Sequence, residues 1–242
     1  MRLSGRTFLL LVALTGIVLV YATGQIAPAD TPYQAQLRVW LAARATGIAA
    51  LVLLTLQVLL GLVLSHPTNQ TVWKLSKRFF PWHENMLVFV VALLAAHIVT
   101  IVVDPYAGVG LAGALVPGLS EYRSAPVALG TLAMYALAVT AVTARYTRLL
   151  PAGAWLKIHR LSLAVLILSW LHGLLAGADG DALRPLYVVS MSLVLAAGTH
   201  RYWVIRRERV AARQATAPAS GPAAVPGPPP IPVPLHITGG DR

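Results

Sequence analysis

The chain has 242 residues, of which 57% are apolar and only 11% carry a charge. Ordinary soluble domains carry about 25% charged residues, so this composition excludes that class and indicates a protein built around membrane-spanning segments. Because the chain has no cysteine, disulfides, zinc–thiolate centres, iron–sulfur clusters and cysteine nucleophiles are also excluded.

Six apolar stretches approach about 20 residues, the length that crosses the hydrocarbon core of a bilayer as a helix. The fifth reaches that length only when it is taken as 159–178, which brings polar residues into the membrane. We therefore expect an all-α fold, an integral six-helix bundle over residues 1–206, in the plasma membrane. In chain order, the six stretches are 7–26, 40–65, 86–103, 127–144, 161–175 and 186–205.

The first stretch, 7–26, also has the features of a cleavable signal peptide. Two basic residues precede its apolar run, and Ala22, Ala27 and Ala29 lie near its end. A retained helix is favoured because the run approaches the length of a membrane span. Cleavage would leave five spans with the same orientation.

The segments that flank these stretches fall into two groups by the sign of their charged residues. Three of the connecting loops carry mainly Asp and Glu, whereas the other segments carry Lys and Arg. Cytoplasmic loops are enriched in Lys and Arg, so both termini are predicted to be cytoplasmic. The net charge of +11 is then a topological signal and an attraction to anionic lipid, and no nucleic-acid partner is expected. The basic residues are Arg2, Arg6, Lys74, Lys77, Arg78, Arg145, Arg148, Lys157, Arg206, Arg207, Arg209 and Arg213.

Four of the seven histidines form two pairs, His83 with His97 on the third stretch and His159 with His172 on the fifth. Ionisable residues inside membrane helices are costly and indicate function. The separations of 14 and 13 residues correspond to rises of about 21 Å and about 19.5 Å. Both helices are predicted to run in the same direction, so His83 should lie level with His159, and His97 with His172.

Facing imidazoles at two depths suit two six-coordinate haem irons, because histidine is an axial haem ligand. Zinc or copper is disfavoured, since each level supplies only two evident nitrogen ligands and structural zinc takes four. The alternative is that these histidines only pack or form hydrogen bonds in the bundle.

The angular positions of His159 and His172 on the fifth helix do not fit this interpretation directly. On an ideal helix the 14-residue step keeps His83 and His97 on one face, whereas the 13-residue step falls about 140° short for His159 and His172. A bulge, a tilt or approach from different sides would absorb the difference. Ser169 and Gly173 would permit close packing or a local distortion.

The composition changes at about residue 215 to Pro, Ala and Gly, so residues 207–242 are expected to be a basic and then disordered tail. About 37 residues follow the last stretch, and the chain has no G-x-G-x-x-G motif and no P-loop. No flavin or nicotinamide domain is therefore expected in this chain.

Two segments resemble the ferric reductase-like transmembrane domain, which is shared by eukaryotic ferric reductases, NADPH oxidases and small bacterial haem membrane proteins. They are W-H-E-N-M-L-V-F-V-V-A-L-L-A-A-H-I-V (82–99) and W-L-K-I-H-R-L-S-L-A-V-L-I-L-S-W-L-H-G (155–173). A-R-A-T-G (43–47) is also similar, and the resemblance covers about 40–203.

The resemblance implies that His83 and His159 hold an inner haem b, and that His97 and His172 hold an outer one. Arg44 matches an arginine that lies by the outer haem in the oxidases. From the residues alone, Arg44 either pairs with a carboxylate such as a haem propionate or extends to the interface.

The family's flavin and NADPH modules are missing here, so the resemblance implies an oxidoreductase component. Electrons would come from a separate flavoprotein reductase or from a quinol. They would pass to ferric iron, oxygen or an extracytoplasmic oxidoreductase, as in the bacterial haem subunit that supplies a periplasmic methionine sulfoxide reductase. Two other functions stay open: a quinone-interacting haem b anchor of a respiratory complex, and a haem-free transporter or scaffold.

Overall fold

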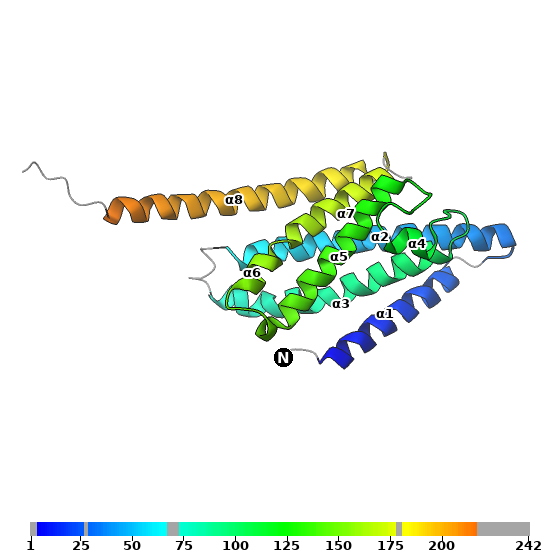
Figure 1. Ribbon diagram of the computed structural model, residues 1–242, viewed down its shortest axis with the longest axis horizontal. Coiled ribbons are helices and arrows are strands. Elements are labelled where there is room, and N and C mark those ends of the chain that lie inside the picture. The colour runs from blue at the N-terminus through cyan, green and yellow to red at the C-terminus, as the bar shows by residue number, and fades with distance from the viewer. Residues whose placement is uncertain (1–3, 27–28, 67–72, 178–180, 217–242) are drawn as a thin grey trace, which may run out of the picture. The chain divides into compact units, whose positions relative to one another are not determined.

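The computed structural model describes residues 4–26, 29–66, 73–177 and 181–216, and within them every regular element is a helix. The prediction of an all-α fold is confirmed for this part of the chain. Ala27 of the signal-peptide alternative and the tail from residue 217 lie outside it. The elements shown in Figure 1 are α1 (Gly5–Ile26), α2 (Pro32–Leu64), α3 (Trp73–Val103), α4 (Gly110–Leu115), α5 (Ser124–Arg145), η2 (Thr147–Leu149), α6 (Ala154–His159), α7 (Ser162–Ala176) and α8 (Arg184–Thr216).

In the part of the chain that the structure describes, five helical segments are long and apolar enough to cross a membrane, which makes this a membrane protein by length and composition. They correspond to the second to sixth predicted stretches, with α6 and α7 together forming one segment. The first stretch lies on α1, where the apolar helix described is the shorter Arg6–Leu19. A sixth span and cytoplasmic termini stay predictions. The five segments are Pro32–Leu64, Arg78–Val103, Ser124–Arg145, Ala154–Ala176 and Arg184–Ala215.

Helix α2 begins well before its apolar stretch because a capping box starts it. The side chain of Thr31 accepts a hydrogen bond from the amide of Gln34, and the side chain of Gln34 accepts one from the amide of Thr31. Pro32 occupies the first turn, where its missing N–H costs no helical bond. The helix therefore extends through polar residues ahead of the segment that hydropathy detects.

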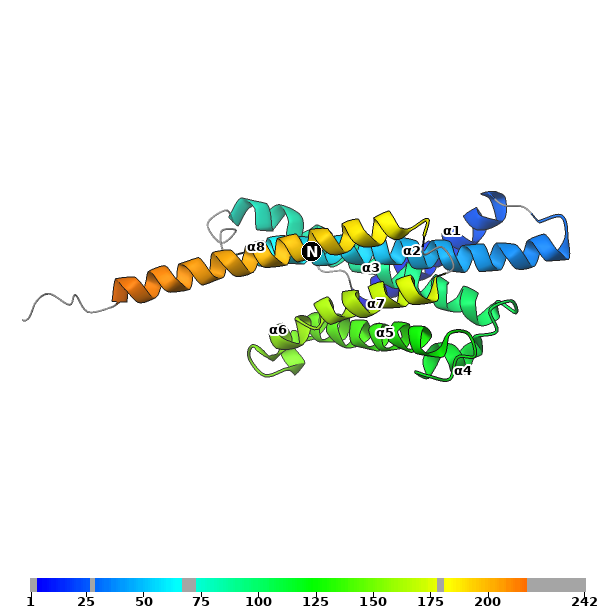
Figure 2. The ribbon, with the colours of Figure 1, turned by 90° about the horizontal axis from the view of Figure 1, so that it is seen from above.

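The chain divides into two units, Met1–Val204 and Ile205–Arg242. In the first unit α2 packs mainly on α3, and α5 packs mainly on α7, as Figure 2 shows from above. Helix α1 also packs on α3, and α2 on α7. Of the second unit, the structure describes only 205–216, the last turns of α8, which carry Arg206, Arg207, Arg209 and Arg213.

A buried apolar cluster lies midway along the main helices of the first unit. Its residues on α2 lie between positions 47 and 61, and Val90 lies midway between His83 and His97 on α3. On α7 its residues lie between His159 and His172. An apolar layer therefore separates the two predicted histidine levels. The cluster comprises Leu51, Leu54, Val58, Val90, Val165, Leu166, Tyr187 and Val194.

Candidate functional site

The structure brings the four predicted histidines together as two pairs. The ring centres of His83 and His159 lie 6.2 Å apart with the ring planes at 81°. Those of His97 and His172 also lie 6.2 Å apart, with the planes at 74°. The pairing and the two levels thus follow the matching spacings along the sequence.

The helix that carries His159 and His172 is interrupted between them. α6 ends at His159 and α7 begins at Ser162, and the amides of Leu161 and Leu163 bond three residues back, to Ile158 and Arg160. Such 3₁₀ bonds advance the chain by about 120° per residue instead of about 100°. This extra turn reduces the rotational shortfall between the two histidines. Of the close packing or local distortion expected at Ser169 and Gly173, the structure shows close packing at Gly173, where a Cβ atom would lie 2.9 Å from the Tyr187 hydroxyl, whereas α7 runs unbroken through both residues.

Backbone carbonyl groups hold both imidazoles of the His97–His172 pair. His97 Nδ1 lies 2.7 Å from the carbonyl oxygen of Ala43, and His172 Nδ1 lies 2.9 Å from that of Pro126. A carbonyl only accepts, so each Nδ1 must carry the proton and donate. The Nε2 of each neutral ring then keeps its lone pair, which is the arrangement of metal-binding histidines that donate Nδ1–H to a carbonyl.

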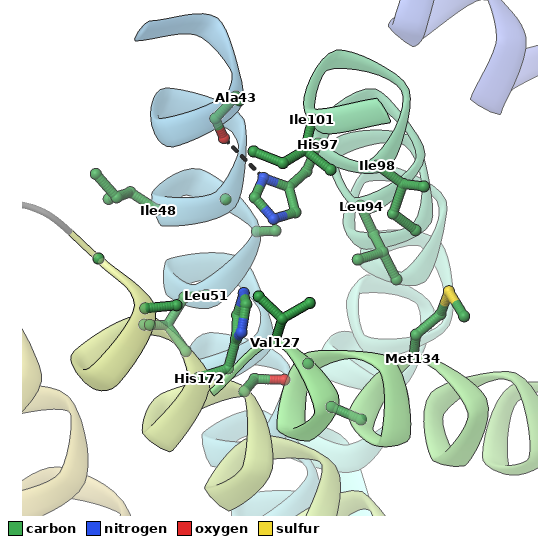
Figure 3. Close-up of a pocket in the computed structure, with 18 of the residues that line it drawn as sticks. Ala43, Ile48, Leu51, Leu94, His97, Ile98, Ile101, Val127, Met134 and His172 are labelled. Carbon is green, nitrogen blue, oxygen red and sulfur yellow. Dashed lines mark hydrogen bonds between the residues drawn. The ribbon is translucent and has the colours of Figure 1, made fainter. Parts of the chain in front are cut away.

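Figure 3 shows His97 and His172 projecting into one cavity. Its lining extends from Trp40 to Leu54 on α2 and from Val90 to Ile101 on α3, lengths of about 21 Å and about 16 Å along the two helices. The lining is mostly apolar and therefore has a low dielectric. Its polar side chains include Arg44, Thr131, Ser169 and Tyr187.

The segment between α3 and α5 contributes to this cavity and is fixed by side-chain bonds. Tyr122, which lines the cavity, donates its hydroxyl to the carbonyl of Ala176 at 3.0 Å. Thr131 donates to the carbonyl of Ala114, another lining residue, at 3.1 Å. Arg44 lies beside this segment, with its Cζ 6.0 Å from the ring centre of Trp40. The guanidinium therefore lies at the His97 end of the cavity.

The His83–His159 pair has a different environment. Its backbone is tied to α2, because the side-chain amide of Gln57 donates to the carbonyl of His83 at 2.8 Å. The Nδ1 atoms of both rings are buried and have no hydrogen-bond partner among the described residues. Buried polar atoms without partners are rare in native structures and indicate a missing water, ion or ligand.

The spacing of the rings fits a metal ion between them. Two imidazole nitrogens at about 2.0 Å from one metal, each about 1.2 Å from its ring centre, place the ring centres about 6.4 Å apart. A direct N–H···N bond of about 2.9 Å in the same line would place them only about 5.3 Å apart. The observed 6.2 Å in both pairs is close to the first value and leaves room for an ion between the rings.

A third histidine pair was not predicted from the sequence. His66, after α2, and His200, on α8, stack with ring centres 5.2 Å apart, and His66 Nε2 lies 3.2 Å from His200 Nδ1. Nearby, Arg201 Nε donates to the carbonyl of Ser65. This pair is close enough for a direct hydrogen bond, which distinguishes it from the two pairs at 6.2 Å. The sequence feature that could have indicated this pair is that both histidines lie near the predicted cytoplasmic ends of their spans.

No family model, curated protein or solved structure matches this chain. The site must therefore be interpreted from its own residues. Over the described ranges, no group of three or more His, Cys, Asp or Glu side chains gathers, so each level offers a pair of imidazoles. A haem needs only two axial ligands because its macrocycle supplies four nitrogens, and the donor set at both levels fits that requirement.

Proposed function

We propose that this chain is a membrane electron-transfer protein that holds two b-type haems. His83 and His159 would hold one, and His97 and His172 the other. The observation that carries the proposal is the meeting of the four histidines as two pairs at two levels, each with ring centres 6.2 Å apart, which is close enough for both imidazoles of a pair to ligate one metal ion. When bound, haem b would supply reversible one-electron chemistry.

The chain's own residues would orient the ligands and exclude water. The carbonyls of Ala43 and Pro126 hold two of the rings in the tautomer that presents Nε2. The step of 14 residues from His83 to His97 gives a rise of about 21 Å, against a hydrocarbon core of about 30 Å. The two levels would therefore cover most of the path across a membrane.

The resemblance to the ferric reductase-like transmembrane domain supports the same function. It suggests a plasma-membrane protein that receives electrons from a cytoplasmic flavoprotein reductase or a quinol. The acceptor would be an extracytoplasmic ferric complex, oxygen or a partner oxidoreductase. In this scheme the chain is the membrane component of an oxidoreductase and binds neither flavin nor nicotinamide itself.

A visible spectrum of the purified full-length chain tests the proposal. We expect a reduced-minus-oxidised spectrum of b-type haem, with about two haems per chain. A stable, folded but colourless protein after expression with sufficient haem supply would overturn the proposal and favour the haem-free transporter or scaffold. One haem per chain would contradict the assignment of two ligand pairs.

Arg44 is expected to raise the midpoint potential of the haem at the His97–His172 level. Arg44→Gln removes a cation and so disfavours the reduced state, which carries one more electron, and the potential should fall on the order of tens of millivolts. Redox titration of the visible spectrum measures the shift. Arg44→Lys keeps the charge and is the matched control, with a smaller shift expected. Equal shifts for both substitutions would contradict an electrostatic role.

A further inference from the structure

Three of the four paired histidine rings lie against glycines of neighbouring helices. A Cβ atom built on Gly47 would lie 3.0 Å from both Cε1 and Nδ1 of His97. A Cβ on Gly130 would lie 2.8 Å from His172 Nδ1, and one on Gly61 would lie 3.2 Å from His83 Cε1. Contacts this short are closer than normal van der Waals packing, so the rings occupy space that any other side chain would need.

Two of these glycines repeat the spacing of the histidines. Gly47 and Gly61 are 14 residues apart on α2, as His83 and His97 are on α3. The Gly47–His97 and Gly61–His83 contacts show that α2 and α3 run antiparallel, so equal spacing places a glycine opposite each ring. Both glycines therefore face α3 at the two histidine levels.

Helix α2 makes a second contact at each level, one turn before each glycine. Ala43 accepts the Nδ1–H bond of His97, and the Gln57 side chain donates to the His83 carbonyl. Ala43 and Gln57 are again 14 residues apart. At each level α2 thus makes one hydrogen bond to the histidine of α3, to the ring of His97 and to the backbone of His83, and one turn later places a glycine against its ring.

Four other helical glycines whose surroundings the structure describes do not face a histidine ring. Gly16 on α1 and Gly198 on α8 have open space where a Cβ would be, a Cβ on Gly113 would meet the backbone of Ser120, and one on Gly173 would meet the Tyr187 hydroxyl. Glycine is the least favourable residue in a helix interior after proline, and small residues in membrane helices often serve backbone approach. At Gly47, Gly61 and Gly130 the nearest atoms are imidazole atoms, so backbone approach does not account for them.

We propose that Gly47, Gly61 and Gly130 are positioning residues that leave room for the histidine rings and set their rotation toward the opposing ring. This inference rests on the proposed haem ligation. It predicts a graded effect of alanine substitution, strongest at Gly130, then Gly47, then Gly61, in the order of the built distances of 2.8, 3.0 and 3.2 Å.

The test compares full-length Gly47→Ala, Gly61→Ala and Gly130→Ala proteins with Gly198→Ala as the matched control. The haem-to-protein ratio and the electron paramagnetic resonance spectrum of the oxidised haems report ligand orientation at each level. We expect Gly47→Ala and Gly130→Ala to shift or lose the His97–His172 signal and keep the other, and Gly61→Ala to shift the His83–His159 signal. Gly198→Ala should change neither. If both haem signals were unchanged in the Gly47→Ala, Gly61→Ala and Gly130→Ala proteins, the inference would be overturned.

A double substitution covers the outcome in which a variant folds poorly. If the Gly47→Ala methyl group acts through the ring, it should lower the thermal unfolding temperature with His97 present and have little effect in a His97→Ala background. An equal loss in both backgrounds would mean that Gly47 serves helix packing, and the inference would fail. A wild-type chain that binds no haem would instead overturn the proposed function, before any glycine variant is compared.

Discussion

Replacing His97 by leucine is expected to remove one haem and leave the other, lowering the ratio from about two haems per chain to about one. Leucine fills the space with an apolar side chain but offers no lone pair to iron. The cavity that contains His97 and His172 does not include His83 or His159 in its lining, and a buried apolar layer lies between the levels. Each site should therefore load independently. Haem content and the reduced-minus-oxidised spectrum measure the loss.

His83→Leu should give the complementary result and remove the signal that His97→Leu retains. The two variants together assign each spectral signal to a level. Val99→Leu is a suitable control on the same helix, because Val99 is 59% exposed and faces away from the cavity. Loss of both signals from a normally folded His97→Leu protein would argue against independent sites.

Spacing alone was sufficient to predict which histidines meet. His83 with His97 and His159 with His172 have nearly equal rises on two helices, and equal rises on helices of the same direction force a two-level pairing. The structure places the rings accordingly, at 6.2 Å in both pairs. Whether they hold haem is a prediction that the ring spacing supports and only the spectrum tests.

The place of the helix break could not be predicted, because no proline or glycine marks it. Ser169 and Gly173 were the residues with an intrinsic tendency to distort, yet the break falls at Arg160 and Leu161. Backbone hydrogen bonds to the residue three positions back tighten the chain where α6 joins α7. No local residue preference therefore accounts for the position of the break.

Two helices also extend further than their apolar stretches predict. α3 begins at Trp73, although its apolar stretch was expected from residue 86, and His83 lies in this more polar part of the helix. α8 continues to Thr216 through a basic segment. A hydropathy window detects the lipid-facing part of a helix, whereas backbone bonding continues wherever side chains allow it.

The glycines opposite the rings were missed for another reason. Gly47 and Gly61 carry a sequence signal, the same 14-residue spacing as the histidines of α3. That signal acquires meaning only when α2 is known to pack antiparallel on α3, and helix neighbours in a membrane bundle are not readable from one sequence. Gly130 has no such repeat and is found only because a Cβ atom built on it would lie 2.8 Å from His172 Nδ1.

Electron transfer across a sealed membrane is expected to require both histidine pairs. Vesicles that contain the full-length chain are loaded with ferricyanide and placed in dithionite. With the wild-type protein, electrons from the external dithionite should reduce the internal ferricyanide, one electron for each ion. His83→Leu and His97→Leu should each fall to the rate of protein-free vesicles, although each keeps one haem. One level alone lies near one boundary of a hydrocarbon core of about 30 Å, and the remaining gap to the other boundary is too long for efficient transfer.

The absorbance of entrapped ferricyanide measures this rate, and the Val99→Leu protein in the same vesicles should match wild type. Vesicles with ferricyanide outside and ascorbate inside test the opposite direction, and protein-free vesicles loaded in the same way show whether the bilayer is sealed. Transfer at the wild-type rate by either the His83→Leu or the His97→Leu protein would show that one histidine pair is sufficient. The two-level path would then be wrong even if both haems were present in the wild-type protein, and the chain would be better described as a haem anchor that exchanges electrons at one face of the membrane.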